Sequence, residues 1–190
     1  MVVRHAPTAA TRTYAFGADE GLDEDGRAAA AALRGALPSG YEVLSGPERR
    51  CLQTAQAAGL PAATVDPALA ECDHGAWAGE TLEVVAAREP EAVRAWTTDP
   101  DARPHGGESV AALAARVAAW LDGQAAREGG AIAITHAGVV KAAVVHALGA
   151  PLHAFWRVDV APLGVTELHA RDGRWTLTQT NMKPLAAVAG

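Results

Sequence analysis

The feature that most constrains the fold is a run of apolar residues at 131–135, Ala-Ile-Ala-Ile-Thr. An unbroken apolar strand of this kind is typically buried on both faces, as in the parallel sheets of α/β proteins. It leads directly into His136. The N-terminus repeats this pattern, because the β-branched pair Val2-Val3 leads into Arg4-His5 before Pro7 stops the strand. Ligands of open α/β sheets bind at the carboxyl ends of the strands, so both histidines are predicted to meet at one site.

The rest of the chain alternates between helix and strand signals. The residue patterns predict helices at 23–37, 48–59 and 137–148, two short helices within 81–98 that break at Pro90, and an amphipathic helix that begins after Ser109. They predict strands at 41–45, 63–65, 158–160, 165–170 and 175–180, with a hairpin turn at 171–174. Residues 8–21 are expected to be irregular, and the tail from Lys183 to be loose. We therefore expect an α/β fold with a single domain over residues 1–190.

Size and charge narrow the function. A chain of 190 residues is long enough to bury a sizeable core. Its formal net charge of −6 argues against nucleic acid as the main partner, since such partners select basic surfaces. We expect neither a signal peptide nor a membrane span, because no stretch is long and apolar enough. The two cysteines, Cys51 and Cys72, are expected to be reduced thiols of a cytoplasmic protein.

Several short segments offer groups suited to binding an anion. Arg49 and Arg50 stand at the start of a predicted helix, where guanidinium groups and free backbone N–H groups together suit phosphate. The glycine pair at 106–107 also precedes a helix, and its N–H groups either bind an anion or form a plain helix cap. The hydroxyl groups of Thr8 and Thr11 are further donors. For each of these residues taken singly, a solvated surface position is the alternative.

Residues 71–79 are predicted to form a loop that contains Glu71, Cys72, His74 and Trp77. A carboxyl group held near an indole ring can have a raised pKa and serve as a general acid. Cys72 and His74 would instead suggest a metal site, but the sequence offers no second pair at ligand spacing. The general acid is therefore the favoured interpretation.

Five motifs, taken in order, resemble those of the histidine phosphatase superfamily, also called the phosphoglycerate mutase-like family. They cover nearly the whole chain, and five in order are far more specific than any one of them. The motifs are Val2-Val3-Arg4-His5, the run from Ser45-Gly46-Pro47-Glu48 to Gln53-Thr54-Ala55, Glu71-x-x-His74-Gly75-x-Trp77-x-Gly79, Pro104-His105-Gly106-Gly107-Glu108-Ser109 and Thr135-His136-Ala137-Gly138. Alignment on Gln53-Thr54-Ala55 makes Arg50, rather than Arg49, the arginine of the second motif.

The resemblance implies a three-layer α/β/α fold with a mostly parallel central sheet, and phosphoryl transfer as the chemistry. His5 would be the nucleophile that carries the phosphoryl group, and Glu71 would protonate the leaving oxygen and later deprotonate water. The phosphoryl oxygens would be held by Arg4, Arg50 and His136, with further phosphate or substrate contacts from Thr8, Thr11, Gly107 and Ala137. No metal and no other cofactor is required by this chemistry.

The preferred hypothesis is a phosphomonoesterase that acts on a small phosphorylated metabolite. The alternatives are an α-ribazole phosphatase-like enzyme of cobalamin synthesis, a phosphoglycerate mutase and a non-catalytic phosphate-binding protein. A short helical cap insertion is expected at about 79–104, and it lacks the arginine pair and lysine that mutases of this family place there. Arg88, Arg94 and His105 are expected at the surface. A homodimer is compatible with the sequence.

Ala6 and Ala137 depart from the family pattern. Ala6 replaces the usual glycine after Arg-His, and Ala137 replaces a frequent glycine or aspartate after the second histidine. Both are small, so little harm is expected from either. Because no acidic residue stands next to His136, the role of general acid falls to Glu71.

Overall fold

The structure is a computed structural model that describes residues 1–183. Its centre is a six-stranded sheet in the order β3-β2-β4-β1-β5-β6. The first four strands in that order are parallel, and β5 pairs antiparallel with both of its neighbours, β1 and β6. The strands are β1 (Val2–Arg4), β2 (Glu42–Ser45), β3 (Thr64–Val65), β4 (Ala131–Thr135), β5 (Val165–Arg171) and β6 (Arg174–Met182). The expected mostly parallel α/β sheet is confirmed.

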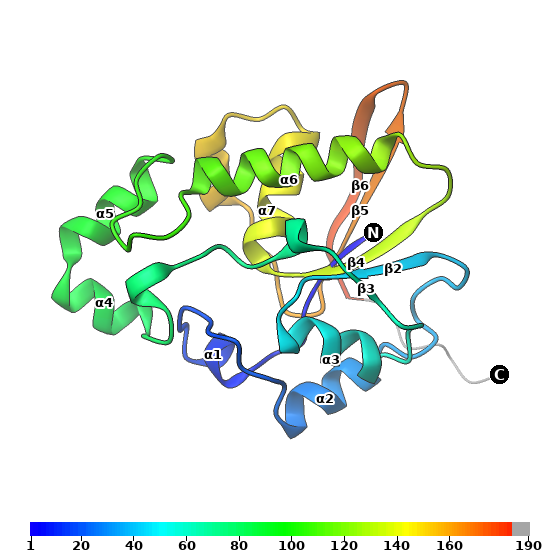
Figure 1. The fold of residues 1–190 in the computed structure, drawn as a ribbon, viewed down its shortest axis with the longest axis horizontal. Coiled ribbons are helices and arrows are strands. Elements are labelled where there is room, and N and C mark those ends of the chain that lie inside the picture. Colours follow the sequence, from blue (N-terminus) through cyan, green and yellow to red (C-terminus); the bar gives the residue numbers. More distant parts are fainter. Residues whose placement is uncertain (184–190) are drawn as a thin grey trace.

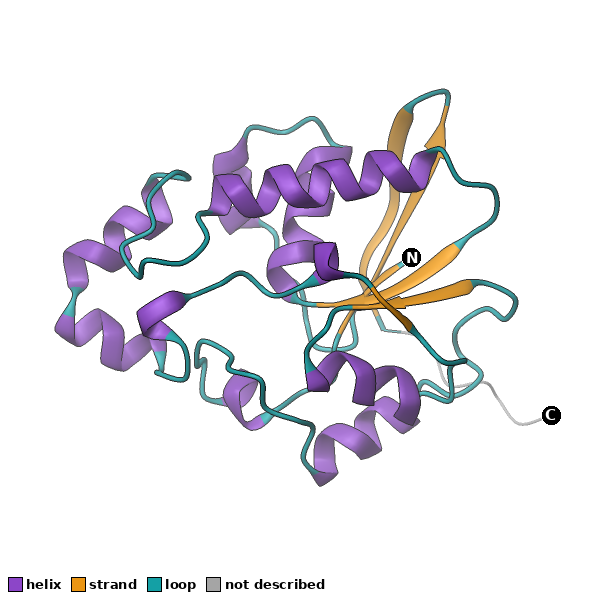
Figure 2. Cartoon of the chain, in the orientation of Figure 1, coloured by secondary structure: helices purple, strands orange, loops and turns teal. Residues whose placement is uncertain are grey.

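Helices cover both faces of this sheet, which gives three layers (Figure 1). On one face lie α2 (Glu24–Ala31) and α3 (Arg49–Ala57), and on the other lie α6 (Val110–Ala125) and α7 (Ala137–Ala147). The short helix α1 (Ala9–Arg12) and the pair α4 (Leu82–Arg88) and α5 (Pro90–Thr98) lie beyond the carboxyl ends of the parallel strands (Figure 2). Three 3₁₀ turns complete the order, η1 (Pro67–Leu69), η2 (Gly75–Trp77) and η3 (Leu152–Arg157).

The core explains why β4 is apolar throughout. Ile132 and Ile134 pack on the α3 side with Cys51 and Ala55. Ala133, between them, packs on the other side with apolar residues of α6 and α7. Successive side chains of a strand point to opposite faces, so a strand between two helical layers needs apolar residues at every position.

Three of the expected elements differ from the structure. Residues 158–160 are not a strand, and the Val160 carbonyl accepts a hydrogen bond from the Arg4 side chain. The helix expected at 23–37 ends at Ala31, where i→i+3 hydrogen bonds continue the chain as turns. The segment 8–21 is not wholly irregular, because Thr8 and Thr11 form a capping box that starts α1. The tail beyond Lys183 lies outside the described residues.

The segment after α1 is fastened to the helices α4 and α5. An isolated antiparallel bridge joins Ala15 to Thr81. The backbone N–H of Phe16 donates to the Glu80 carbonyl at 2.9 Å, and the N–H of Gly79 donates to the Phe16 carbonyl at 2.7 Å. The side chain of Phe16 is buried in a cluster with Trp77 and Val85. One wall of the molecule beyond the sheet is thus built from two distant parts of the sequence.

Candidate active site

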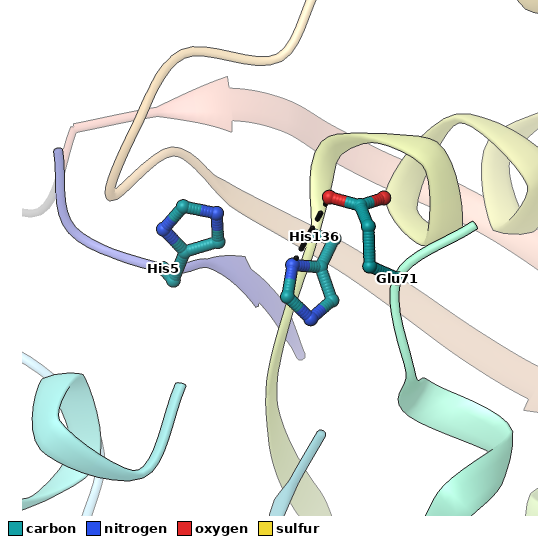
Figure 3. A group of neighbouring side chains, drawn as sticks. All are labelled: His5, Glu71 and His136. Atoms are coloured by element: carbon teal, nitrogen blue, oxygen red, sulfur yellow. Dashed lines mark ion pairs between the residues drawn. The ribbon is translucent and has the colours of Figure 1, made fainter. Parts of the chain in front are cut away.

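His5 and His136 follow the two central strands and lie side by side. Arg4 of β1 is in register with Thr135 of β4, and the N–H of His5 donates to the Thr135 carbonyl at 2.8 Å. The two imidazole rings have centroids 5.1 Å apart, and both are buried. Figure 3 shows them with the carboxylate of Glu71 beside His136. The structure therefore brings together the two strand-histidine motifs of the sequence.

His5 is held as a neutral imidazole. Its Nδ1 lies 2.7 Å from the Ala6 carbonyl oxygen, and a carbonyl only accepts, so Nδ1 carries the hydrogen and Nε2 keeps its lone pair. Burial, together with the positive charges of His136 and Arg50, lowers the pKa of His5 to about 3. At neutral pH the ring therefore has a nucleophilic nitrogen.

Arg50 is the buried arginine of the pair at the start of α3, whereas Arg49 is exposed. The Arg50 guanidinium donates to the Ala18 carbonyl and lies 3.3 Å from Glu20 Oε2. On its other side, Nη2 lies 3.6 Å from Glu71 Oε2. Arg50 thus stands inside the site with its position fixed from both sides.

His136 lies between two carboxylates. Its Nδ1 is 3.2 Å from Glu71 Oε2, and its Nε2 is 2.7 Å from Glu48 Oε2. Burial alone would lower the pKa of His136, but Glu71, the Cys51 thiol and Glu48 outweigh burial and raise that pKa well above its ordinary value. Both ring nitrogens then carry hydrogen, and His136 is a fixed cation next to neutral His5.

Glu71 is the carboxylate of this cluster. Burial would raise its pKa, but the ion pair and hydrogen bond with His136 outweigh burial and hold the pKa of Glu71 below its usual range. Its backbone N–H donates to Glu48 Oε1 at 2.9 Å. Without substrate, Glu71 is therefore ionised and suited to accept a proton.

Glu48 is the residue of this site that the sequence analysis did not single out. One of its carboxylate oxygens holds the His136 ring, and the other holds the backbone of Glu71. The signal was available, since Glu48 is an acidic residue within the second of the five motifs, two positions before Arg50. Its meaning depends on β4, which is distant in sequence but adjacent to β2 in the sheet.

A cavity of about 260 Å³ opens beside these groups. Of the predicted site residues, those that line it are Arg4, His5, Thr11, Arg50, Glu71 and Ala137. His136 lies directly behind Glu71 and Arg50. A larger hollow of about 460 Å³ lies at the opposite ends of the strands, around Glu42, Ala131 and Trp175, and contains none of these residues.

Thr8 and Gly107 are not brought to the cavity. The Thr8 hydroxyl accepts the N–H of Thr11 and donates to Glu20, so it caps α1. Gly107 packs against the loop at Asp73, and its N–H donates to His105 Nδ1 at 3.1 Å. Their polar groups are thus used within the fold.

The three other residues expected at the surface behave differently from one another. Arg88 and Arg94 are exposed, and they form ion pairs with Glu80, Glu89 and Glu91. His105 is buried, contrary to expectation, because it packs against Trp77 with ring centroids 5.0 Å apart. The two cysteines are both free, as expected, and the structure shows that both are buried.

Two groups of side chains could offer three metal ligands each within the described residues, His5-Glu71-His136 and Glu48-Cys51-His136. Both need His136 as a neutral ligand, but its carboxylate neighbours favour the imidazolium. Arg50 adds a second cation at 3.3 Å from His136 Nδ1. This donor set suits an anion better than a metal ion. Cys72 and His74 belong to neither group.

A sequence model of the histidine phosphatase superfamily (branch 1) matches residues 1–183. A bifunctional protein of Mycobacterium tuberculosis is 32% identical over 196 aligned positions, which cover 95% of this chain and 53% of that protein. The chain thus spans about half the length of the curated relatives it matches. No helix in the described part of the chain has the length and apolarity needed to cross a membrane.

Solved structures of phosphatases have the same fold. A mycobacterial glucosyl-3-phosphoglycerate phosphatase superposes with a TM-score of 0.82 at 28% identity, covering 95% of this chain and 96% of that chain. A putative α-ribazole-5′-phosphate phosphatase from Escherichia coli superposes with a TM-score of 0.83 at 21% identity, covering 97% and 96%. At the second identity, the likeness concerns the fold alone.

Proposed function

The chain belongs to the histidine phosphatase superfamily, and from this premise we propose that it hydrolyses a small phosphomonoester through a phosphohistidine on His5. The observation that carries the proposal is a buried neutral imidazole, with Nδ1 hydrogen-bonded to a carbonyl and with fixed cations beside it. An imidazole in this state is a nucleophile, and the surrounding cations suit a phosphoryl group.

In the first step, His5 Nε2 attacks phosphorus as the bond from phosphorus to the ester oxygen breaks. Negative charge spreads over the three phosphoryl oxygens and the leaving oxygen. Arg4 and Arg50, both at the cavity, and His136 behind Glu71 bind the phosphoryl oxygens. Glu71 gives its proton to the leaving oxygen, so the products are an alcohol and phosphohistidine.

Glu71 is ionised without substrate, so its proton comes with the substrate. A phosphomonoester has a second pKa near 6, and its monoanion carries the proton that Glu71 needs. Once the phosphoryl oxygens lie beside Glu71, like-charge repulsion raises the pKa of its carboxyl group. The same repulsion loosens the pair between Glu71 and His136, whose Nδ1–H then turns to a phosphoryl oxygen.

In the second step, water attacks the phosphohistidine. Glu71, ionised after the first step, takes a proton from that water, and the bond from phosphorus to His5 Nε2 breaks. Glu71 returns its proton to a phosphoryl oxygen, and inorganic phosphate leaves as H2PO4⁻. Glu71 is then ionised again, and His5 returns to its neutral state with Nδ1 still bound to the Ala6 carbonyl. No step requires a metal ion.

The cap insertion at 79–104 favours hydrolysis over mutase chemistry. Its arginines Arg88 and Arg94 are exposed and paired with acidic neighbours. Neither lines the cavity. The α-ribazole phosphatase-like alternative concerns the identity of the substrate, and a substrate panel decides it.

The test is turnover of 4-nitrophenyl phosphate in the presence of a metal chelator, followed by trapping of the enzyme with ³²P-labelled substrate. We expect chelator-resistant hydrolysis that His5→Ala abolishes. Glu71→Gln should retain ³²P on the protein, because nitrophenolate leaves without an acid whereas attack by water still needs a base. General acid-base catalysis of this kind contributes about 10²- to 10⁴-fold.

Arg49→Gln is the matched control, since it removes an exposed charge next to Arg50 and should keep normal turnover. If His5→Ala retains turnover, or if label stays on the His5→Ala protein, the proposed mechanism is wrong. Phosphate binding without turnover of any phosphomonoester would identify a non-catalytic phosphate-binding protein instead.

A further inference from the structure

Resting on the proposed function, we propose that the leaving group of the substrate combines a flat apolar part with an acidic group, and that Lys141 binds this acidic group. The cavity next to His5 is shared by the catalytic groups and a set of residues that the reaction does not use. These residues would contact the leaving group, which is the part of the substrate that remains after the phosphoryl group has been transferred.

One wall of the cavity is mostly aromatic. It is lined by Leu82 and by the aromatic residues Tyr14, Phe16, Trp96, Phe155 and Trp156. The rings of Trp96 and Trp156 have centroids 4.6 Å apart and stand at 73° to each other, and Phe16 and Trp96 have centroids 5.6 Å apart at 71°. Aromatic side chains that line a cavity offer apolar surface on which a flat apolar group of a ligand can pack.

These aromatic residues come from three separate parts of the chain. Phe16 follows α1, Trp96 belongs to α5, and Trp156 belongs to η3. Tyr14, at 80% exposed, stands at the edge of the cavity.

Lys141 is the cation of this wall. It lies one helical turn after Ala137 on α7, and Ala137, Gly138 and Lys141 all line the cavity. Its ammonium lies 5.5 Å from the ring centre of Phe155 and 5.6 Å from that of Trp156. Within the described residues it forms no ion pair, although Asp159 and Glu71 influence it from a greater distance. Burial lowers the pKa of Lys141.

An ammonium among aromatic rings is costly to desolvate unless an anion pairs with it. The phosphoryl group already has Arg4, Arg50 and His136 beside it, and Lys141 lies a turn farther along α7. A carboxylate or similar acid on the leaving group, extending along the aromatic wall, would reach Lys141 while phosphorus stays at His5. This chemistry selects an acidic, apolar phosphomonoester over a sugar or polyol phosphate.

The test compares carboxyphenyl phosphate with its neutral carboxamide counterpart, as a pair of equal size and shape. We expect the wild-type protein to prefer the carboxylate by about tenfold or more in kcat/KM, as for one charge-assisted hydrogen bond. Lys141→Met keeps an apolar stem of similar length against the rings and should remove the preference. Lys141→Arg should restore it.

The outcomes separate this inference from the proposed function. If neither compound nor 4-nitrophenyl phosphate is hydrolysed, the proposed function fails. If 4-nitrophenyl phosphate is hydrolysed while carboxyphenyl phosphate is not, only the inference fails. If both are hydrolysed equally by the wild type, or if Lys141→Met slows both by the same factor, the inference fails, because Lys141 then has no role or serves the phosphoryl group. The apolar part is tested with benzyl and ethyl phosphate, and equal KM values for the two would exclude it.

Discussion

At the scale of single residues, the two histidines of the site lie beside each other with opposite shifts in pKa. His5 is buried and lies near two cations, His136 and Arg50, so its neutral form is favoured. The Ala6 carbonyl fixes the hydrogen of this neutral ring on Nδ1. His136 contacts a carboxylate at each ring nitrogen, so its charged form is favoured. Both rings are buried, so the two identical side chains take the roles of nucleophile and cation because the charges of their neighbours differ.

We predict that Glu48→Gln weakens catalysis at alkaline pH more than at acidic pH. The substitution replaces a carboxylate 2.7 Å from His136 Nε2 with a neutral amide, so the pKa of His136 should fall. The alkaline limb of the profile of kcat/KM against pH should shift to lower pH. The loss above pH 7.5 should be about tenfold or more, as for a hydrogen bond to a charged group.

The measurement is the pH profile on an aryl phosphate, supported by NMR titration of His136. Arg49→Gln, which changes an exposed neighbour, should leave the profile unchanged. A uniform loss at every pH in Glu48→Gln would show that Glu48 supports only the fold of the site.

At the scale of elements, α1 begins with Thr8, whose hydroxyl accepts the N–H of Thr11. We predict that Thr8→Ala lowers the free energy of unfolding by about 1 kcal/mol, as for the loss of an N-cap. Urea unfolding measures this loss, and Thr8→Ser should recover most of it. The inhibition constant of inorganic phosphate should stay within about threefold. A much weaker inhibition with unchanged stability would make Thr8 a phosphate ligand instead.

A second prediction at this scale concerns two glycines with opposite surroundings. A Cβ on Gly107 would lie 2.1 Å from the Asp73 carbonyl oxygen, whereas a Cβ on Gly123 in α6 would meet open space. Gly107→Ala should push away the loop that carries Glu71, and therefore lower both the free energy of unfolding and kcat. Gly123→Ala should raise the free energy of unfolding by about 0.5–1 kcal/mol. If Gly107→Ala left kcat unchanged, the packing of these loops would not position Glu71.

At the scale of the whole molecule, the sequence predicted what depends on local pattern and missed what depends on distant packing. β4 occupies the predicted residues 131–135, because a strand buried on both faces has an unmistakable composition. The expected strand at 158–160 does not form, and this segment instead contacts Arg4, more than 150 residues away, through the Val160 carbonyl. Gly107 likewise uses its N–H within its own loop.

The same distinction applies to the site. His5 and His136 were predictable because each follows its own strand, and parallel strands end at one edge. The contacts of Glu48 and Lys141 required the arrangement of the sheet, since their partners come from β4, η3 and the loop at 71. Residue type alone shows only that each carries a charge.

The buried histidines also make the stability of the whole molecule depend on pH. The pKa of His5 is lowered to about 3 in the folded state, against about 6.5 in an unfolded chain. Below pH 6.5, His5 therefore binds a proton in the unfolded state but not in the folded state. The free energy of unfolding falls as pH falls. His74 and His105, whose pKa values are also lowered, act in the same direction. His136 acts oppositely, since its raised pKa makes stability fall as pH rises above 6.5.

We predict that His5→Asn flattens the acid side of this dependence. Asparagine keeps a donor near the position of Nδ1 for the Ala6 carbonyl but does not titrate. Urea unfolding between pH 5 and 6.5 should show the wild type losing more stability than the variant, by about 1 kcal/mol per pH unit once the unfolded histidine is charged. Above pH 6.5 the difference between the two proteins should be constant. If the two proteins differed in free energy of unfolding by the same amount at every pH, folded His5 would take up a proton as readily as an unfolded histidine. His5 would then not be held as a neutral nucleophile.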